Sequence, residues 1–325
     1  MNEKIFHTYI KTFRYHPFER LFDKSIKGFV KDSFTDENST LYAIVRTKRV
    51  EFITESFYPI SNYCVVGQVK CGEKVYSVMF NVAKTWYYSE SDVSIRLKNR
   101  FKTFDEFTKH FMDQYGNPEK PEISNSDKYM SLASIDLEQS TSKSLFVDCP
   151  IARAMNTGKS MCAELPIYQV LNMFDVDCME SLDICYIGKS TASTFDRLRK
   201  HEKWGPIMAQ KRDDEDYLVY FFEIADNEIS RDHNGLINYV RRDRNNLPKD
   251  ALVRLCEASL INFYKPEFND EYVDTELANS GLYHKWLKGN GYTKVVTEVE
   301  LEGLLGRLGT NHRSFSTRQE ITIDL

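Results

Sequence analysis

Hydrophobic residues in the first 116 positions follow two kinds of spacing. Across residues 3–22, aliphatic and aromatic residues recur at near-helical intervals, which predicts a helix there. Four later segments are rich in β-branched and aromatic residues, and each is expected to be a strand: Leu41–Val45, Val50–Ile53, Cys64–Val69 and Val75–Val82. The turn residues 71–74 predict a hairpin between the last two of these strands. Thr103 and Glu106 form a capping-box signature, so a helix is expected over Phe104–Tyr115.

The rest of the chain has a different order of elements. Strands are expected at Ile167–Met173, Leu182–Gly188 and Tyr217–Ile224, and helices at Ser193–Lys203, Leu236–Arg242 and Pro248–Tyr264. This β-β-α-β-α-α order predicts a small sheet covered by helices. Residues 117–145 are polar, punctuated by proline and rich in serine and threonine, as linkers are.

These patterns together predict a mixed α+β or α/β protein with two domains. Residues 1–116 are expected to form a mixed α+β domain whose role could be targeting, specificity or partner binding. Residues 117–145 are expected to be a linker, and residues 146–325 to be the helix-flanked sheet with a C-terminal extension.

Composition places the chain among soluble globular proteins. Of its 325 residues, 42% are apolar and 28% are charged. No apolar run approaches the roughly 20 residues of a membrane helix, and the N-terminus lacks a signal-peptide stretch, so a cytoplasmic protein without membrane contact is expected. The seven cysteines are odd in number and have no CxxC spacing, which argues against a disulfide framework or a structural zinc site and favours reduced thiols, mostly in the core.

Charge is unevenly distributed along the chain. The formal net charge is −5, yet residues 189–212 hold seven basic side chains against the acidic Asp196 and Glu202. Such a concentration of positive charge can meet phosphates, although it is also found on ordinary solvated helix faces. Its basic members are Lys189, Arg197, Arg199, Lys200, Lys203, Lys211 and Arg212.

Several polar residues within this part of the chain could act on a phosphate. Tyr186-Ile187-Gly188 ends an expected strand and is followed by Lys189. Arg197 and His201 stand four residues apart, which places them on one face of the expected helix, where both can converge on one phosphate. Glu257 interrupts an apolar stretch of helix, and a buried carboxylate needs a partner such as a hard cation. Asn269 follows twelve residues later in Lys265-Pro266-Glu267-Phe268-Asn269.

In this order and spacing, residues 164–272 resemble the GIY-YIG nuclease superfamily. The resemblance identifies Tyr186-Ile187-Gly188 with the second motif strand, and Pro166-Ile167-Tyr168 with the first, where proline replaces the usual glycine. The long interval between the two tyrosines and the lysine after YIG are similar to the restriction-endonuclease-like branch. No resemblance is visible over residues 1–150.

The resemblance implies a metal-dependent endonuclease that hydrolyses DNA phosphodiesters, with a role for each residue. Tyr168 or Tyr186 would orient or deprotonate the attacking water, with Lys189 as a cationic helper. Arg197 would stabilise the charge of the transition state, and His201 would hold or protonate the phosphate or the water. Glu257 would bind one Mg²⁺ or Mn²⁺. Asn269 would fix the local backbone.

Three functions follow as alternatives. The first is a restriction-type endonuclease, for which a homodimer or higher oligomer suits a double-strand cut. The second is a phage-defence or mobile-element nuclease whose N-terminal domain binds a protein partner or a nucleotide signal. The third is a GIY-YIG module that binds nucleic acid without cleaving it. The near-neutral N-terminal domain favours the second over a large surface for direct DNA readout, which is usually basic.

Overall fold

The computed structural model describes residues 3–22, 39–60, 64–88, 92–115, 134–148, 162–179, 181–189, 198, 201–234, 237–243, 249–271, 273 and 281–325. Its contacts divide the chain into two compact units. Unit 1 is discontinuous and consists of Met1–Lys48 and Met179–Leu325, whereas unit 2 is the continuous segment Arg49–Cys178. Unit 2 is therefore an insertion in the sequence of unit 1.

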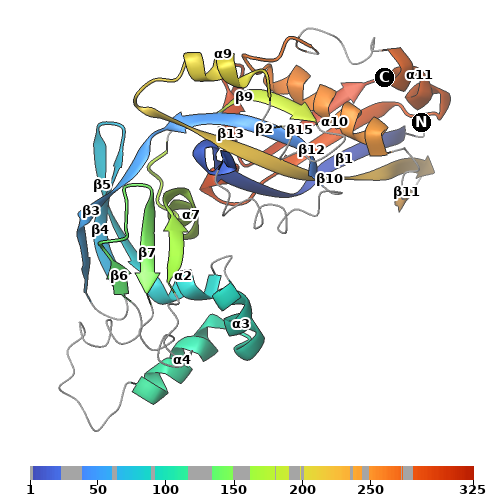
Figure 1. Cartoon of the computed structure of the whole chain (residues 1–325). Helices are drawn as coiled ribbons and strands as arrows, with labels where there is room; N and C mark the ends of the chain where they lie inside the picture. The colour runs from blue at the N-terminus through green and yellow to red at the C-terminus, as the bar shows by residue number, and fades with distance from the viewer. Residues whose placement is uncertain are drawn as a thin grey trace. The chain divides into compact units, whose positions relative to one another are not determined.

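Unit 1 is built on a large mixed sheet of nine described strands, in the order β14-β13-β9-β2-β10-β1-β12-β15, with β11 paired to β10 (Figure 1). The strands are β1 (Glu3–Pro17), β2 (Ser39–Lys48), β9 (Leu182–Lys189), β10 (Glu215–Asn234), β11 (Ile237–Asp243), β12 (Lys294–Glu300), β13 (Leu308–Thr310), β14 (Arg313–Ser316) and β15 (Arg318–Asp324). The 3-10 helices η1 (Phe18–Phe22) and η3 (Leu304–Gly306) and the helices α9 (Trp204–Ala209), α10 (Lys249–Tyr264) and α11 (Gly281–Gly289) accompany it.

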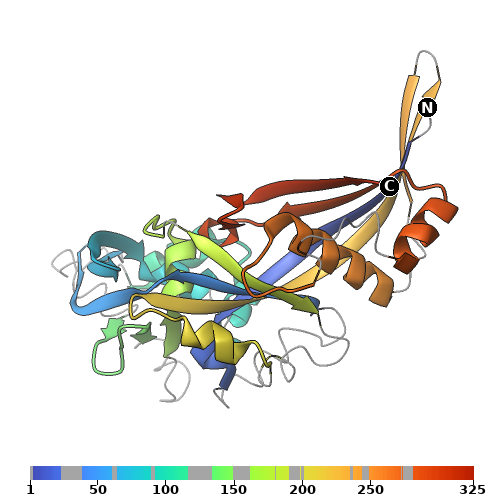
Figure 2. The same cartoon turned by 90° about the horizontal axis from the view of Figure 1, so that it is seen from above.

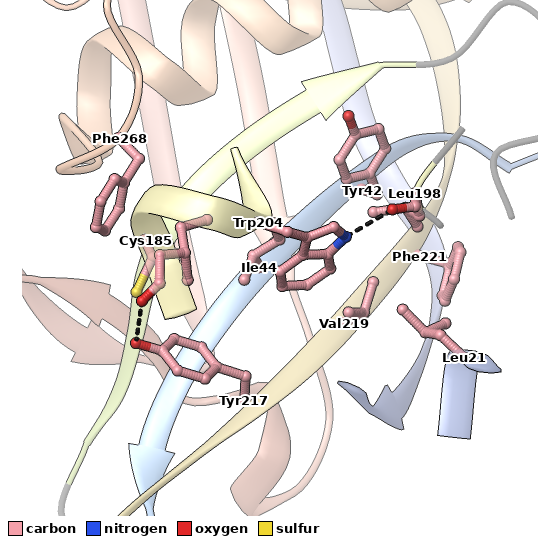
Figure 3. Packing of buried hydrophobic residues seen from close by; sticks show 11 residues of the cluster. Leu21, Tyr42, Ile44, Cys185, Leu198, Trp204, Tyr217, Val219, Phe221 and Phe268 are labelled. Atoms are coloured by element: carbon pink, nitrogen blue, oxygen red, sulfur yellow. Dashed lines mark hydrogen bonds between the residues drawn. The ribbon is translucent and has the colours of Figure 1, made fainter. Parts of the chain in front are cut away.

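Two hydrophobic clusters fix the helices to this sheet. Helices α10 and α11 pack with β1 and β12 in a cluster of Phe6, Leu252, Leu255, Ala258, Leu287, Tyr292 and Val295. Figures 1 and 2 show α10, in orange, lying against the sheet beside β9. The second cluster, defined here as the Trp204 cluster, joins α9 and η1 to β2, β9 and β10 and includes Tyr42, Ile44, Leu198, Tyr217, Val219 and Phe221 (Figure 3). Because α10 is apolar on nearly all sides, eleven of its sixteen residues are buried.

Unit 2 contains two three-stranded antiparallel sheets, in the orders β3-β4-β5 and β6-β7-β8. Its strands are β3 (Val50–Pro59), β4 (Cys64–Cys71), β5 (Lys74–Asn81), β6 (Ser134–Asp136), β7 (Ser144–Asp148) and β8 (Ala163–Pro166). Its described helices are α2 (Val82–Tyr88), α3 (Asp92–Arg100), α4 (Phe104–Tyr115) and α7 (Ile167–Met173). Ala83, Tyr87, Phe101 and Phe107 form the aromatic core of its helical part.

Many sequence expectations are confirmed. The four expected strands between residues 41 and 82 correspond to β2, β3, β4 and β5, except that Val82 begins helix α2, and β4 and β5 form the expected hairpin. Helix α4 begins after a capping box, in which the Glu106 N–H donates to Thr103 Oγ1 at 3.1 Å and the Lys102 N–H donates to Glu106 Oε2 at 2.8 Å. Strands β9 and β10 and helix α10 also coincide with predicted elements. None of the six described cysteines forms a disulfide, and four of them are buried.

Three predicted elements are wrong. Residues 3–17 form strand β1 instead of a helix, because Ile5–Thr8 lie between β10 and β12 and are buried on both faces, which removes the alternation of a half-exposed strand. Residues 167–173 form helix α7 instead of a strand. Residues 237–243 form strand β11 instead of a helix, held by pairing to β10. The expected helix 193–203 falls outside the described residues, apart from Leu198 and residues 201–203.

The domain division also differs from the predicted one of 1–116, linker 117–145 and 146–325. Strands β1 and β2 pair with β10, β12 and β9, so the beginning of the chain folds with its C-terminal half. Part of the expected linker forms strand β6 and the start of β7, and residues 116–133 lie outside the described residues. Among the helices that the structure describes, none has both the length and the apolar character needed to cross a membrane.

Candidate active site

The YIG segment lies on β9, which is hydrogen-bonded antiparallel to β2. Tyr42 of β2 stands directly opposite Gly188, and Ile44 opposite Tyr186. A Cβ added to Gly188 would lie 2.7 Å from the Tyr186 ring and 2.7 Å from the Tyr42 ring. Glycine is therefore required at this position because both tyrosine rings close over its backbone.

Three aromatic side chains gather on this face of the sheet. The Tyr42 and Tyr186 ring centroids lie 6.1 Å apart. The His201 ring meets both of them edge-on, at 4.8 Å from Tyr186 and 5.8 Å from Tyr42. Tyr42 is fully buried whereas Tyr186 and His201 are partly exposed, so Tyr186 and His201 are the members that a substrate can reach.

The orientation of His201 is set by the turn that precedes α9. The main-chain N–H of Lys203 donates to His201 Nδ1 at 3.1 Å. In the neutral imidazole, Nδ1 is then the acceptor and the ring proton resides on Nε2. Trp204, the first residue of α9, contacts the main chain before His201, since its Nε1–H donates to the Leu198 carbonyl at 2.6 Å (Figure 3).

Asn269 binds the main chain of β9 from the side opposite β2. The Ile187 N–H donates to Asn269 Oδ1 at 2.9 Å, and Asn269 Nδ2 donates to the Ile187 carbonyl at 2.8 Å. The Phe268 N–H also donates to the Cys185 carbonyl at 3.0 Å. The side-chain amide thus pairs with the strand as another strand would, which matches the backbone-fixing role that the sequence suggested.

Lys189 and Glu257 form an ion pair at the carboxyl end of β9. Lys189 Nζ lies 2.7 Å from Glu257 Oε2, and only 9% of the Glu257 side chain is exposed. Alternation along β9 directs Tyr186 and Gly188 to one face of the sheet, and Lys189 to the face covered by α10. The aromatic group and the ion pair therefore lie on opposite faces of the sheet, both near the carboxyl end of β9.

Glu257 is the acidic side chain beside β9 that could bind a metal ion. No group of three or more histidine, cysteine, aspartate or glutamate side chains is arranged to hold a metal within the described part of the chain. Mg²⁺ nevertheless needs few protein ligands, since it often binds through one or two carboxylates together with waters and substrate phosphates. Glu257 fits that limited role, with the Lys189 ammonium placed as the competing cation on its carboxylate.

A second lysine contributes charge beside the aromatic group. Lys203 Nζ lies 2.6 Å from Asp270 Oδ2, and this hydrogen bond raises the pKa of Lys203. Tyr186 adds a smaller effect in the same direction, so the Lys203 charge acts on Tyr186. Lys203 thus lies near Tyr186 and joins the turn that carries His201 to Asp270, the residue that follows Asn269.

Two of the predicted site residues are not placed with the others. Tyr168 lies on α7 in unit 2 and is buried there, because Pro166 ends β8 and the chain enters a helix. Its identification as the tyrosine of a first motif strand is wrong, since no strand carries it. Arg197 lies outside the described residues. The others lie along β9 in unit 1, where Tyr186 contacts His201, Asn269 holds the main chain of Ile187, and Lys189 pairs with Glu257 on the opposite face of the sheet.

Tyr42 is the residue that the sequence reasoning missed. It lies on the strand that pairs with β9, and its ring contacts Tyr186 and His201. A signal existed, because Leu41–Val45 was an expected strand with a tyrosine at its second position. Tyr168 was chosen instead because it lies nearer to Tyr186 in the sequence, whereas the whole of unit 2 separates β2 from β9.

Comparison with known proteins adds no further assignment. No family model, curated protein or solved structure matches this chain. The functional reading therefore depends on the residues and contacts described above.

Proposed function

We propose that this protein is a metal-dependent endonuclease that hydrolyses DNA phosphodiester bonds, with its active site at the carboxyl end of β9. The observation that carries the proposal is the two-strand arrangement of β2 and β9, in which Tyr42 and Tyr186 close over Gly188 while Asn269 holds Ile187. This is the architecture expected of a GIY-YIG nuclease, with Tyr42 in place of Tyr168 as the first tyrosine.

The chain's own residues divide the work at the phosphate. Tyr186, which is partly exposed, orients the attacking water, and the Lys203 ammonium is the charged group that interacts with it electrostatically. His201 offers its Nε2–H to a phosphate oxygen. The GIY-YIG resemblance gives Arg197 the role of adding a positive charge that would stabilise the transition state.

Glu257 is the residue that would hold Mg²⁺ or Mn²⁺. Bound metal would stabilise the negative charge that develops on the leaving 3′ oxygen. Because Lys189 pairs with Glu257 in this structure, a bound metal would have to displace the lysine from that carboxylate.

Plasmid cleavage tests the proposal. Wild-type protein is incubated with supercoiled plasmid in Mg²⁺, in Mn²⁺ and in EDTA, beside Glu257→Gln and the exposed control Glu320→Gln. We expect metal-dependent cutting by wild type and by Glu320→Gln, and a loss of about 100-fold or more in Glu257→Gln. DNA that is bound but never cut would establish a binding module instead. Discrete fragments indicate the restriction type, whereas cutting of phage or modified DNA alone indicates the defence type.

A further inference from the structure

The end of β10 and the whole of β11 form an antiparallel ribbon, referred to here as the β10–β11 ribbon, and Glu228–Arg231 of β10 also pair on their other side with Glu3–Phe6 of β1. Its register runs from Glu228↔Asp243 to Asn234↔Ile237. Among the described strands, β11 pairs with β10 alone, and in Figure 2 the paired ends of the two strands stand clear of the rest of the sheet. Seven residue pairs extend about 20 Å at about 3.3 Å per residue.

One face of this ribbon has positive charge. Directly opposed residues of an antiparallel pair project to the same face, so Arg231 lies beside Val240, and Arg242 lies beside Ile229 two positions further along. Among the described side chains of the ribbon, this face carries two guanidinium groups and no carboxylate. Arg231 contacts Glu3 of the neighbouring strand at 3.4 Å but keeps 60% of its side chain exposed.

The opposite face is acidic and internally paired. It carries Glu228, Asp243 and Arg241. Arg241 Nε lies 2.5 Å from Asp243 Oδ2, and Lys4 Nζ lies 3.2 Å from Glu228 Oε2. The two faces therefore differ in charge, and the face with Arg231 and Arg242 is the one suited to an anionic partner.

The distance between the ribbon and the candidate active site is close to the length of one helical turn of DNA. Lys189 pairs with Leu41, and Leu41 pairs with Phe222, so these three residues mark one row across β9, β2 and β10. Arg231 lies nine residues beyond Phe222 on the same strand, which is about 30 Å. That span corresponds to about nine base pairs, close to one turn of B-DNA, so both regions can meet the same side of one duplex.

We propose that the β10–β11 ribbon is a second DNA-contacting element, which binds the substrate duplex about one helical turn from the scissile phosphate through Arg231 and Arg242. The inference rests on the proposed function, because it requires a DNA substrate at the end of β9. Only the tip of the ribbon, residues 232–234 with 237–239, is two-stranded and has the width that the major groove of B-DNA admits, whereas Arg231 and Arg242 lie at its base, where β1 also pairs with β10. The arginines supply phosphate or guanine contacts.

The charges of β11 argue against a second copy of the chain as the occupant. An edge strand that recruits another strand is usually flat and apolar, whereas charged side chains protect an edge from such pairing. Exposed Arg241 and Arg242 are adjacent on this edge strand. Two ribbons aligned edge to edge would bring these positive charges together.

Equilibrium DNA binding tests the ribbon separately from cleavage. A 30-base-pair duplex is titrated in fluorescence anisotropy, without divalent metal and over a range of salt concentrations. The variants are Arg231→Gln/Arg242→Gln, the charge-retaining Arg231→Lys/Arg242→Lys, and the control Arg241→Gln on the opposite face. Circular dichroism melting and light scattering report folding and oligomeric state for each variant.

We expect the double glutamine variant to bind about tenfold more weakly, with a salt dependence reduced by about two released counterions. The lysine pair should recover most of the binding, and Arg241→Gln should stay within about threefold of wild type. Equal binding by wild type and the double glutamine variant would overturn the inference, as would a change in oligomeric state in place of a change in DNA affinity. If wild type neither binds nor cuts DNA, the proposed function itself fails. If wild type cuts DNA but the double glutamine variant binds DNA as tightly as wild type, only the proposed role of the ribbon is refuted.

Discussion

Replacing Asn269 by alanine removes two hydrogen bonds from the middle of β9. Both involve the main chain of Ile187, which is 2% exposed. Each hydrogen bond contributes about 1 kcal/mol, and a buried amide or carbonyl left without a partner costs about 1 to 3 kcal/mol. Because Asn269 is itself partly exposed, water can replace some of the loss. We therefore expect unit 1 to be destabilised by about 2 to 4 kcal/mol.

Hydrogen exchange measured by mass spectrometry resolves this loss without requiring that the two units unfold together. Exchange in a peptide spanning residues 182–189 should accelerate by at least about 30-fold, since about 1.4 kcal/mol corresponds to a factor of ten. Asn290→Ala is the matched control, because its amide makes one exposed hydrogen bond to the Trp286 carbonyl. If the 182–189 peptide of Asn269→Ala exchanged as slowly as that of wild type, Asn269 would not fix β9 and the positioning role would be refuted.

Three further predictions follow from the same contacts. Gly188→Ala should abolish cleavage while leaving a folded protein, because the added Cβ would lie 2.7 Å from two tyrosine rings, which must then move. Cleavage assays and near-ultraviolet circular dichroism check this prediction, and full activity would contradict it. Burial and two neighbouring arginines lower the pKa of His16 to about 4 from 6.5, so the unfolded chain binds the proton first as the pH falls and stability is lost between pH 6.5 and pH 4. Between pH 7 and pH 4.5, the free energy of unfolding measured in urea should fall by about 2 kcal/mol less for His16→Gln than for wild type. Equal decreases in the two proteins would argue against this assignment. Lys189→Met should tighten Mn²⁺ binding at Glu257 in calorimetry, whereas weaker binding would show that the lysine does not compete with the metal.

Local sequence patterns correctly predicted the elements whose start, end and buried positions are encoded within their own residues. Helix α4 has its capping box, and α10 has its long apolar run, so both could be recognised without knowing their neighbours. Strand β1 could not, because its apolar residues face neighbours on both sides of the sheet and lose the two-residue period of a half-buried strand. Strand β11 depends on pairing with β10, which is a tertiary effect that overrides local preference.

The candidate site divides in the same way. Tyr186, Lys189, His201, Glu257 and Asn269 follow one another along the chain after the insertion, and their order alone identified them. The contacts within the group could not be predicted, since the sequence gives no sign that Lys189 pairs with Glu257 and not with a tyrosine. The aromatic partner of Tyr186 was the hardest to find, because it comes from β2, which is separated from β9 in the sequence by the whole of unit 2.

The insertion explains why that partner was misassigned and why it can still function. A strand pair tolerates a long connection at small entropic cost, because loop closure grows only with the logarithm of length, and a folded insert with its own core adds still less disorder. Strands β2 and β9 keep one register from Leu41↔Lys189 to Ile44↔Tyr186, and after a β-bulge they pair again from Val45↔Ile184 to Arg46↔Asp183. Arg46 Nη2 lies 2.6 Å from Asp183 Oδ2 at the end where the chain leaves for unit 2. This ion pair fixes the two strands together where the insertion begins and ends. The geometry over Gly188 is consequently set by the β2–β9 register, whatever the length of the chain between the two strands.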